Sequence, residues 1–228
     1  MSPEVEVIWV QQPGRGARFS EEPYTGVQAT ADEIAAGLNM YADAPFAFYG
    51  HSLGAVIAFE VARKLRRDGN RMPCHLFVGA ARAPHLERIQ PSLRNLSDEV
   101  FLNAVHTRYA GIPAAVSDEP ELMQLFLPLL RADFTAYETY TCVEEPPLSC
   151  PITAFTGSED PIVKLDAVQQ WASHTNEKFT AHVLPGDHFF LNANSALLTK
   201  KIREALLIFD LNHSHRTDKS HPFEEARA

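Results

Sequence analysis

Residues 46–54 of this 228-residue chain read Phe-Ala-Phe-Tyr-Gly-His-Ser-Leu-Gly, and the fold prediction starts from this stretch. Its first four residues are apolar, as in a buried strand, and a helical pattern runs from Ala55 to Arg67. A G-x-S-x-G turn between a strand and a helix is the setting of a nucleophile elbow, which raises a serine hydroxyl above the sheet. Ser52 is therefore the predicted nucleophile. An ordinary serine at a helix N-cap is the alternative, and it does not explain both flanking glycines.

Strand-like and helix-like segments alternate on both sides of this turn. Apolar runs predict strands at residues 5–10, 45–49, 75–79, 152–156 and 179–184. Helical patterns predict helices at residues 30–41, 55–67 and 196–209. Strands separated by helices favour an α/β fold, with a mostly parallel sheet that carries helices on both faces.

One segment breaks this alternation. Residues 97–140 are helical in pattern without an intervening strand, which predicts a helical lid inserted into the fold. The length of the chain suits one domain, predicted at residues 1–210 with the lid inside it. Residues 211–228 are polar and lack periodicity, so we expect a disordered tail, and we assign no role to the histidines in it.

A serine hydroxyl needs a base to take its proton, and the base needs an acid to hold its tautomer. Asp160 follows the predicted strand at 152–156, and His188 follows the one at 179–184. Both therefore lie at the carboxyl ends of parallel strands, at the same edge of the sheet as Ser52. Their order along the chain, Ser then Asp then His, is also the order expected after such an elbow. The sequence predicts a catalytic triad of Ser52, Asp160 and His188.

Other residues near these positions compete for a role. Three further carboxylates are rivals for the acid: Glu159, Asp166 and Asp187. His51 is too close to Ser52 in sequence to act readily as its base, so we expect it to line the wall of the substrate site, with Phe189 as a second substrate-binding residue.

Composition excludes several classes of function. The formal net charge is −9 and 21% of the residues are charged, which gives no basic footprint for nucleic acid or an anionic membrane. The first ten residues lack the basic start of a signal peptide, and the odd set of Cys74, Cys142 and Cys150 suits a reducing compartment. We expect a cytoplasmic monomer that needs neither a metal nor an organic cofactor.

Several motifs together resemble a known family. They are Val-Gln-Gln-Pro-Gly-Arg-Gly at 10–16, the elbow, Ala-Arg-Ala-Pro-His at 81–85, Leu-Arg-Ala-Asp-Phe at 130–134 and Pro-Gly-Asp-His-Phe-Phe-Leu at 185–191. In this order they resemble the type II thioesterases of nonribosomal peptide and polyketide synthesis, which belong to the α/β-hydrolase superfamily. The likeness runs in register from about Val5 to about Phe209.

The resemblance implies a function in the biosynthesis of antibiotics and other secondary metabolites. Such enzymes hydrolyse acyl or aminoacyl groups from the phosphopantetheine arm of carrier domains, which clears misloaded units. By the same resemblance, the Leu53 backbone N–H stabilises the oxyanion and residues 97–140 cover an acyl channel. The apolar residues of that segment suit a channel lining, although helical spacing more often means core packing: Phe101, Leu125, Phe126, Leu129 and Phe134.

The resemblance also implies a departure from the family pattern. Members carry an N-terminal strand and a Gly-rich loop ahead of the position where this sequence begins, and that loop supplies the second oxyanion amide. We therefore expect a homologue without this strand and loop. Two alternatives stay open: a general esterase or acyltransferase with the same triad, and a catalytically impaired homologue that only binds carrier domains.

Overall fold

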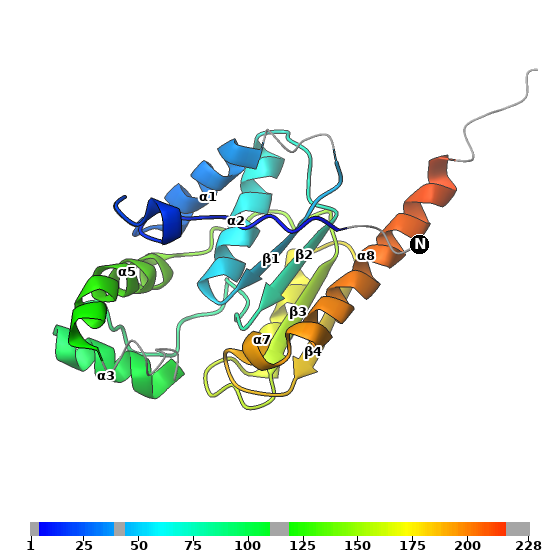
Figure 1. Cartoon of the computed structure of the whole chain (residues 1–228). Helices are drawn as coiled ribbons and strands as arrows, with labels where there is room; N and C mark the ends of the chain where they lie inside the picture. Colours follow the sequence, from blue (N-terminus) through cyan, green and yellow to red (C-terminus); the bar gives the residue numbers. More distant parts are fainter. Residues whose placement is uncertain (1–4, 39–43, 110–118, 218–228) are drawn as a thin grey trace, which may run out of the picture.

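The computed structural model describes residues 5–38, 44–109 and 119–217. Figure 1 shows a sheet with helices packed around it. The strands are β1 (Ala47–His51), β2 (His75–Gly79), β3 (Ile152–Gly157) and β4 (Phe179–Leu184). The α-helices are α1 (Val27–Gly37), α2 (Leu53–Arg67), α3 (Asp98–Tyr109), α5 (Pro120–Thr139), α6 (Leu165–Gln169), α7 (Phe190–Ala193) and α8 (Ser195–Thr217). Two 3-10 helices are η1 (Gly16–Arg18) and η3 (Gln170–His174).

The sheet has four strands in the order β1-β2-β3-β4, and every pair is parallel. The predicted parallel α/β sheet is therefore confirmed. The bounds of β2 and β4 are those expected, β1 extends to His51, and β3 extends to Gly157. Because all four strands point the same way, the residues that follow β1, β3 and β4 lie at one edge of the sheet.

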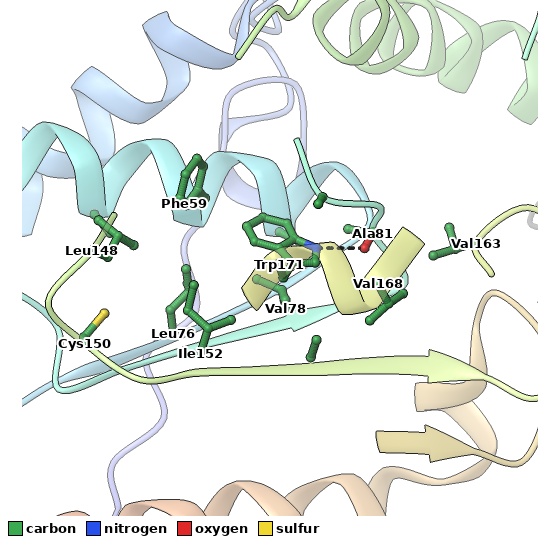
Figure 2. Close-up of a cluster of buried hydrophobic side chains, with 14 residues drawn as sticks. Phe59, Leu76, Val78, Ala81, Leu148, Cys150, Ile152, Val163, Val168 and Trp171 are labelled. Carbon is green, nitrogen blue, oxygen red and sulfur yellow. Dashed lines mark hydrogen bonds between the residues drawn. The ribbon is translucent and has the colours of Figure 1, made fainter. Parts of the chain in front are cut away.

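Alternate residues of the strands pack against the two helical layers. On one face, Leu76 and Ile152 lie against Phe59 of α2 and against Trp171 of η3, which is fully buried (Figure 2). The indole Nε1 of Trp171 donates a hydrogen bond of 2.9 Å to the carbonyl oxygen of Ala81, just beyond β2. On the other face, the core continues through aromatic strand residues to α7 and α8. The two-residue period of side chains along a strand explains this division.

The predicted strand at residues 5–10 is wrong. The segment forms no strand, and its apolar side chains are exposed, with Trp9 at 87%. Within the described chain, β1 pairs only with β2, and no strand bonds to residues 5–10. An apolar run becomes a strand only where a neighbour accepts and donates its backbone hydrogen bonds, and sequence pattern alone does not supply that neighbour.

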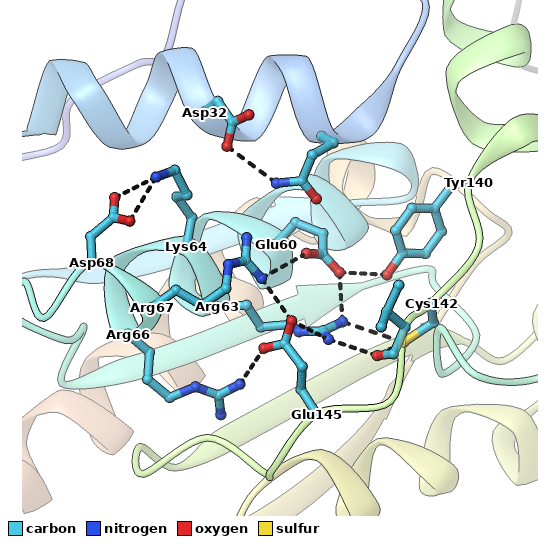
Figure 3. Close-up of polar contacts among 12 residues, drawn as sticks. Asp32, Glu60, Arg63, Lys64, Arg66, Arg67, Asp68, Tyr140, Cys142 and Glu145 are labelled. Atoms are coloured by element: carbon cyan, nitrogen blue, oxygen red, sulfur yellow. Dashed lines mark hydrogen bonds and ion pairs between the residues drawn. The ribbon is translucent and has the colours of Figure 1, made fainter.

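A buried ion-pair network fastens the segment after α5 to α2, the helix that follows Ser52 (Figure 3). The Arg63 guanidinium donates to Glu60 at 2.8 Å and lies 2.7 Å from a carboxylate oxygen of Glu145. The Tyr140 hydroxyl donates to Glu60 at 2.7 Å. Arg63 and Glu60 are almost fully buried, so removal of one partner costs about 3–5 kcal/mol by leaving the other charge unpaired.

The predicted lid contains two helices, α3 and α5, and residues 110–118 between them lie outside the described chain. The helices share an apolar cluster of their own, in which Phe101 is fully buried and its ring meets that of Phe134 edge to face at 5.3 Å. Leu125 is instead 49% exposed. Phe101 is thus a core residue of the lid, as helical spacing most often indicates, and does not line a channel.

The C-terminal helix is longer than the sequence pattern suggested. Helix α8 continues to Thr217, whereas the pattern predicted its end near Phe209. The rest of the predicted tail, residues 218–228, lies outside the described residues. The division into a domain at 1–210 and a disordered tail stays a prediction.

Candidate active site

The elbow places Ser52 between β1 and α2 in a strained backbone conformation. Ser52 has φ 53° and ψ −118°, a region that side chains rarely adopt, and its amide donates to the Gly79 carbonyl at 2.8 Å. Its side chain makes no capping hydrogen bond to α2, which disfavours the N-cap alternative. A Cβ at Gly50 would collide with the Gly54 carbonyl, whereas a Cβ at Gly54 would meet no described atom within 4 Å beyond its chain neighbours and the backbone of its own helix.

His188 lies on the loop after β4 and is almost fully buried. Its Nε2 is 3.0 Å from Ser52 Oγ, and its Nδ1 is 2.9 Å from Asp160 Oδ2. This loop is packed tightly on the end of β3, because a Cβ at Gly157 would overlap the Asp187 carbonyl oxygen. The structure therefore brings together the serine, the imidazole and the carboxylate that the sequence predicted.

Asp160 is held in the ionised form that such an arrangement needs. Burial would raise the pKa of Asp160, but hydrogen bonds from His188 and from the amides of Ile162 and Val163 outweigh it and lower that pKa below its usual value. The two amides donate to Oδ1 at 2.8 and 3.0 Å, so Oδ2 faces His188. An ionised Asp160 accepts a hydrogen bond from Nδ1–H of His188, which leaves Nε2 unprotonated and able to accept the Ser52 hydroxyl proton.

The three rival carboxylates do not share this position. Glu159 is exposed. The Asp166 carboxylate accepts a hydrogen bond from the backbone amide of Ala167, and the Asp187 carboxylate accepts one from the amide of Phe189. Within the described chain none of these three carboxylates is hydrogen-bonded to the His188 ring. The geometry thus favours Asp160 as the acid, and its catalytic role is taken up below as part of the proposal.

His51 makes a contact that sequence reasoning did not predict. Its Nε2 lies 2.8 Å from the carbonyl oxygen of His188, and its Nδ1 lies 3.2 Å from the Tyr49 hydroxyl. Burial, followed by the nearby His188, lowers the pKa of His51 to about 4, so its ring is neutral near pH 7. A carbonyl only accepts, so Nε2 carries the proton and Nδ1 accepts from Tyr49. The His51 ring also stacks on Phe189, with centroids 6.1 Å apart.

Two further features border the site. The Leu53 amide is the first of α2, and the opening amides of a helix have no intrahelical partner, so it is available for an oxyanion. The Tyr109 ring, from the end of α3, meets the His188 ring edge to face at 5.3 Å, which places the end of α3 against His188. No sequence signal marked Tyr109, because this contact joins elements distant along the chain.

Neither a metal cluster nor a membrane-spanning helix occurs among the described residues. No group of three or more His, Cys, Asp or Glu side chains there could hold a metal ion. In the same part of the chain, no helix is long and apolar enough to cross a membrane.

Known proteins of similar sequence include members of one enzyme family. The family model described as "Thioesterase domain" matches residues 1–206. A protein of Brevibacillus parabrevis named linear gramicidin dehydrogenase LgrE is 39% identical over 206 residues, which cover 89% of this chain and 78% of LgrE. Its name denotes a different activity from the family model and from the structures that follow.

Two solved structures are named as thioesterases. RedJ, a thioesterase of the prodiginine pathway of Streptomyces coelicolor, is 39% identical with a TM-score of 0.77, over 84% of this chain and 76% of RedJ. YbtT, a type II thioesterase of the yersiniabactin pathway, is 32% identical with a TM-score of 0.76, over 85% of this chain and 78% of YbtT.

Proposed function

Because this chain belongs to the thioesterase family, we propose that it hydrolyses acyl or aminoacyl thioesters on the phosphopantetheine arm of carrier domains. Family membership makes it a hydrolase of thioesters with the α/β-hydrolase fold. The single observation that carries the proposal is the bonded series Asp160–His188–Ser52, with distances of 2.9 and 3.0 Å. The relative YbtT, a type II thioesterase of an NRPS/PKS pathway, supports the carrier domain as the partner.

In the proposed mechanism Ser52 is acylated and then freed by water. Ser52 Oγ attacks the thioester carbonyl while its proton passes to Nε2 of His188, and Asp160 stabilises the imidazolium. The Leu53 amide donates to the oxyanion. The C–S bond breaks as His188 returns the proton to the leaving thiolate, and water activated by His188 then releases the carboxylic acid and restores Ser52.

The test is a panel of substrates that share one acyl group. The acyl group is supplied on a phosphopantetheinylated carrier domain, on N-acetylcysteamine and as a simple ethyl ester. The proposal expects free acid from the carrier thioester with the highest kcat/KM of the three. A preference for the simple ester would identify a general esterase. Binding of the carrier without release of acid would identify a protein that only docks carriers.

The monomeric state and the cytoplasmic location expected from the sequence are part of this proposal. Size-exclusion chromatography with light scattering at micromolar protein concentration checks the monomeric state. Fractionation of the producing cells with an antibody to this chain checks the second. A stable dimer, or recovery outside the cytoplasm, would contradict the corresponding part.

A further inference from the structure

A cleft beside the triad is bordered by arginines, although the whole chain is acidic. It has a volume of about 370 Å³ and lies between the loop after β2 and the helices α3 and α5. Arg82, Arg88 and Arg108 line it. The acidic residues of the lining are Glu87, which is exposed, and Glu138, whose carboxylate accepts from Ser92 Oγ and from the amides of Leu93 and Arg94.

Arg82 is half-buried, and it differs from two other arginines with a buried Nε atom in having no bonding partner. The Nε atoms of Arg15, Arg63 and Arg82 are all buried without a hydrogen-bond acceptor. Arg15 and Arg63 nevertheless form ion pairs through their terminal nitrogens, with Asp133 and Glu60 respectively. Among the described residues, Arg82 has neither a hydrogen bond nor an ion pair. A buried Nε–H without an acceptor is costly, and the rest of this half-buried guanidinium is open to a ligand that supplies one.

The backbone holds Arg82 in place from both sides. The Ala81 carbonyl accepts from Trp171 at 2.9 Å, and the Ala83 amide donates to the Ala167 carbonyl at 3.1 Å. Both alanines are buried, and Figure 2 shows the bond from Trp171 to Ala81. Arg82 is therefore presented from a rigid turn, so little conformational entropy is lost when it binds a ligand.

A second arginine of the same loop lines the cleft and is held against α5. Arg88 donates to the Tyr137 carbonyl at 2.8 Å, and its guanidinium lies 5.0 Å from the centre of the Tyr137 ring. Only part of its fork of donors is used by this bond, so further N–H groups remain for an anion. Two arginines held on one cleft are the arrangement that recognises a phosphate through several charge-assisted hydrogen bonds.

Two residues that line the cleft connect it to the triad. Tyr109 lines it and contacts the His188 ring at 5.3 Å, and Val56, one turn along α2 from Ser52, lines it as well. An extended ligand could thus place an anionic end at the arginines and a reactive end near Ser52. On the proposed function, the substrate has this form, with a phosphate at one end of a pantetheine chain and a thioester at the other.

We infer that Arg82, assisted by Arg88, binds the phosphate of the phosphopantetheine arm. This inference rests on the proposed function and adds a recognition site outside the triad. It follows from an arginine without an acceptor, held on a rigid turn, in a cleft lined by Tyr109, which contacts His188.

The test removes the phosphate from the substrate and the arginine from the protein, separately and together. Two substrates carry the same acyl group, one on phosphopantetheine and one on pantetheine. Wild type should prefer the phosphorylated substrate by about 10- to 100-fold in kcat/KM, mainly through KM, as expected for charge-assisted hydrogen bonds. Arg82→Gln should lose that preference by slowing only the phosphorylated substrate. Arg94→Gln, with the same charge change at an exposed residue outside the cleft, should keep it.

The outcomes separate the two proposals. Hydrolysis of both substrates at the same kcat/KM by wild type, or an identical loss on both for Arg82→Gln, would overturn the phosphate site and leave the thioesterase proposal intact. No hydrolysis of either would instead remove the proposed function. Calorimetry with phosphopantetheine and pantetheine as ligands then still decides the site, because wild type must bind the phosphorylated one more tightly and Arg82→Gln must not.

Two natural sources of this phosphate are distinguished by further substrates. Acyl-carrier domain and acyl-coenzyme A are compared at the same concentration with wild type and Arg82→Gln. A lower kcat/KM of Arg82→Gln on both substrates identifies the phosphate that they share as the group recognised. A higher wild-type kcat/KM on the carrier domain than on acyl-coenzyme A identifies the carrier arm as the source. Thermal melting of Arg82→Gln, expected near the wild-type temperature, shows that the variant is folded.

Discussion

The imidazole of His51 donates a hydrogen bond from Nε2 to the carbonyl oxygen of His188, at 2.8 Å. His51 therefore positions the loop of the proposed base, instead of only lining a wall. His51→Leu should lower kcat by about tenfold with little change in KM, because one hydrogen bond contributes about 1 kcal/mol and the loop loses its register. His51→Gln retains a donor at a similar reach and should recover most of kcat. Steady-state kinetics on an acyl thioester measures both.

A purely structural role for His51 predicts a different result. In that case both variants would lower the melting temperature and the amount of active enzyme, with no distinction between Leu and Gln in kcat per active site. An increase in KM as the main effect would restore the expectation that His51 contacts substrate.

Asp160→Asn tests the acid. The amides of Ile162 and Val163 would hold the asparagine oxygen at the Oδ1 position, which turns its NH₂ group toward Nδ1 of His188. His188 would then adopt the wrong tautomer, and kcat should fall by about 10⁴-fold while the fold is kept. Glu159→Gln and Asp187→Asn are the matched controls and should each cost less than about tenfold. A larger loss in either control than in Asp160→Asn would show that the acid is misassigned.

The two glycines of the elbow should respond differently to alanine. A Cβ at Gly50 would overlap the Gly54 carbonyl, so Gly50→Ala should distort the turn and cost several kcal/mol of the free energy of unfolding. Gly54 lies inside α2 with open space around the added methyl group among the described residues, so Gly54→Ala should be neutral or stabilise the fold by up to about 1 kcal/mol. Urea unfolding of both variants measures the difference. Comparable destabilisation of the two would contradict the geometry.

Stability should fall on mild acidification because of buried neutral histidines. Burial, with a smaller contribution from Lys178, lowers the pKa of His75 to about 4, against about 6.5 in an unfolded chain. Between these values the unfolded state binds more protons, so His75 lowers the free energy of unfolding by up to about 1.4 kcal/mol per pH unit as pH falls from 6.5 toward 4. Above pH 6.5 this contribution is constant.

The effect of His75 can be isolated by substitution. His75→Gln can still bond to Thr153, which His75 contacts at 2.8 Å, and should show a smaller loss of stability between pH 7 and pH 5 than wild type. His106→Gln, at an exposed residue of α3, should behave as wild type does. Urea titrations at the two pH values test this. An identical loss in wild type and His75→Gln would refute the contribution of His75.

The sequence pattern predicted the strands whose apolar residues are the ones that pack in the sheet. The apolar runs at 75–79 and 179–184 became β2 and β4, and the residues at their ends gave the positions of Asp160 and His188 relative to Ser52. The order of these residues along the chain and their places after strand ends were sufficient to predict that they meet, because the residues that follow parallel strands lie at one edge of the sheet.

Other features depend on contacts between distant segments. The run at 5–10 has the composition of a strand, but within the described chain no neighbouring backbone pairs with it. The short helices α6 and η3 lack the length over which periodicity can be recognised, although η3 carries the buried Trp171. The contact of Tyr109 with His188 and the unpaired state of Arg82 likewise arise only when the loops and the lid helices assemble around the cleft.

The central claim is that Ser52 is the nucleophile of a carrier thioesterase, and the direct test is acid release from an acylated carrier domain by Ser52→Ala. The substitution leaves the backbone at φ 53° as it is, so the melting temperature should stay near that of wild type. Turnover should fall by about 10⁴-fold or more, whereas Ser158→Ala, at an exposed serine after β3, should retain it. Retention of most wild-type turnover by folded Ser52→Ala would contradict the account.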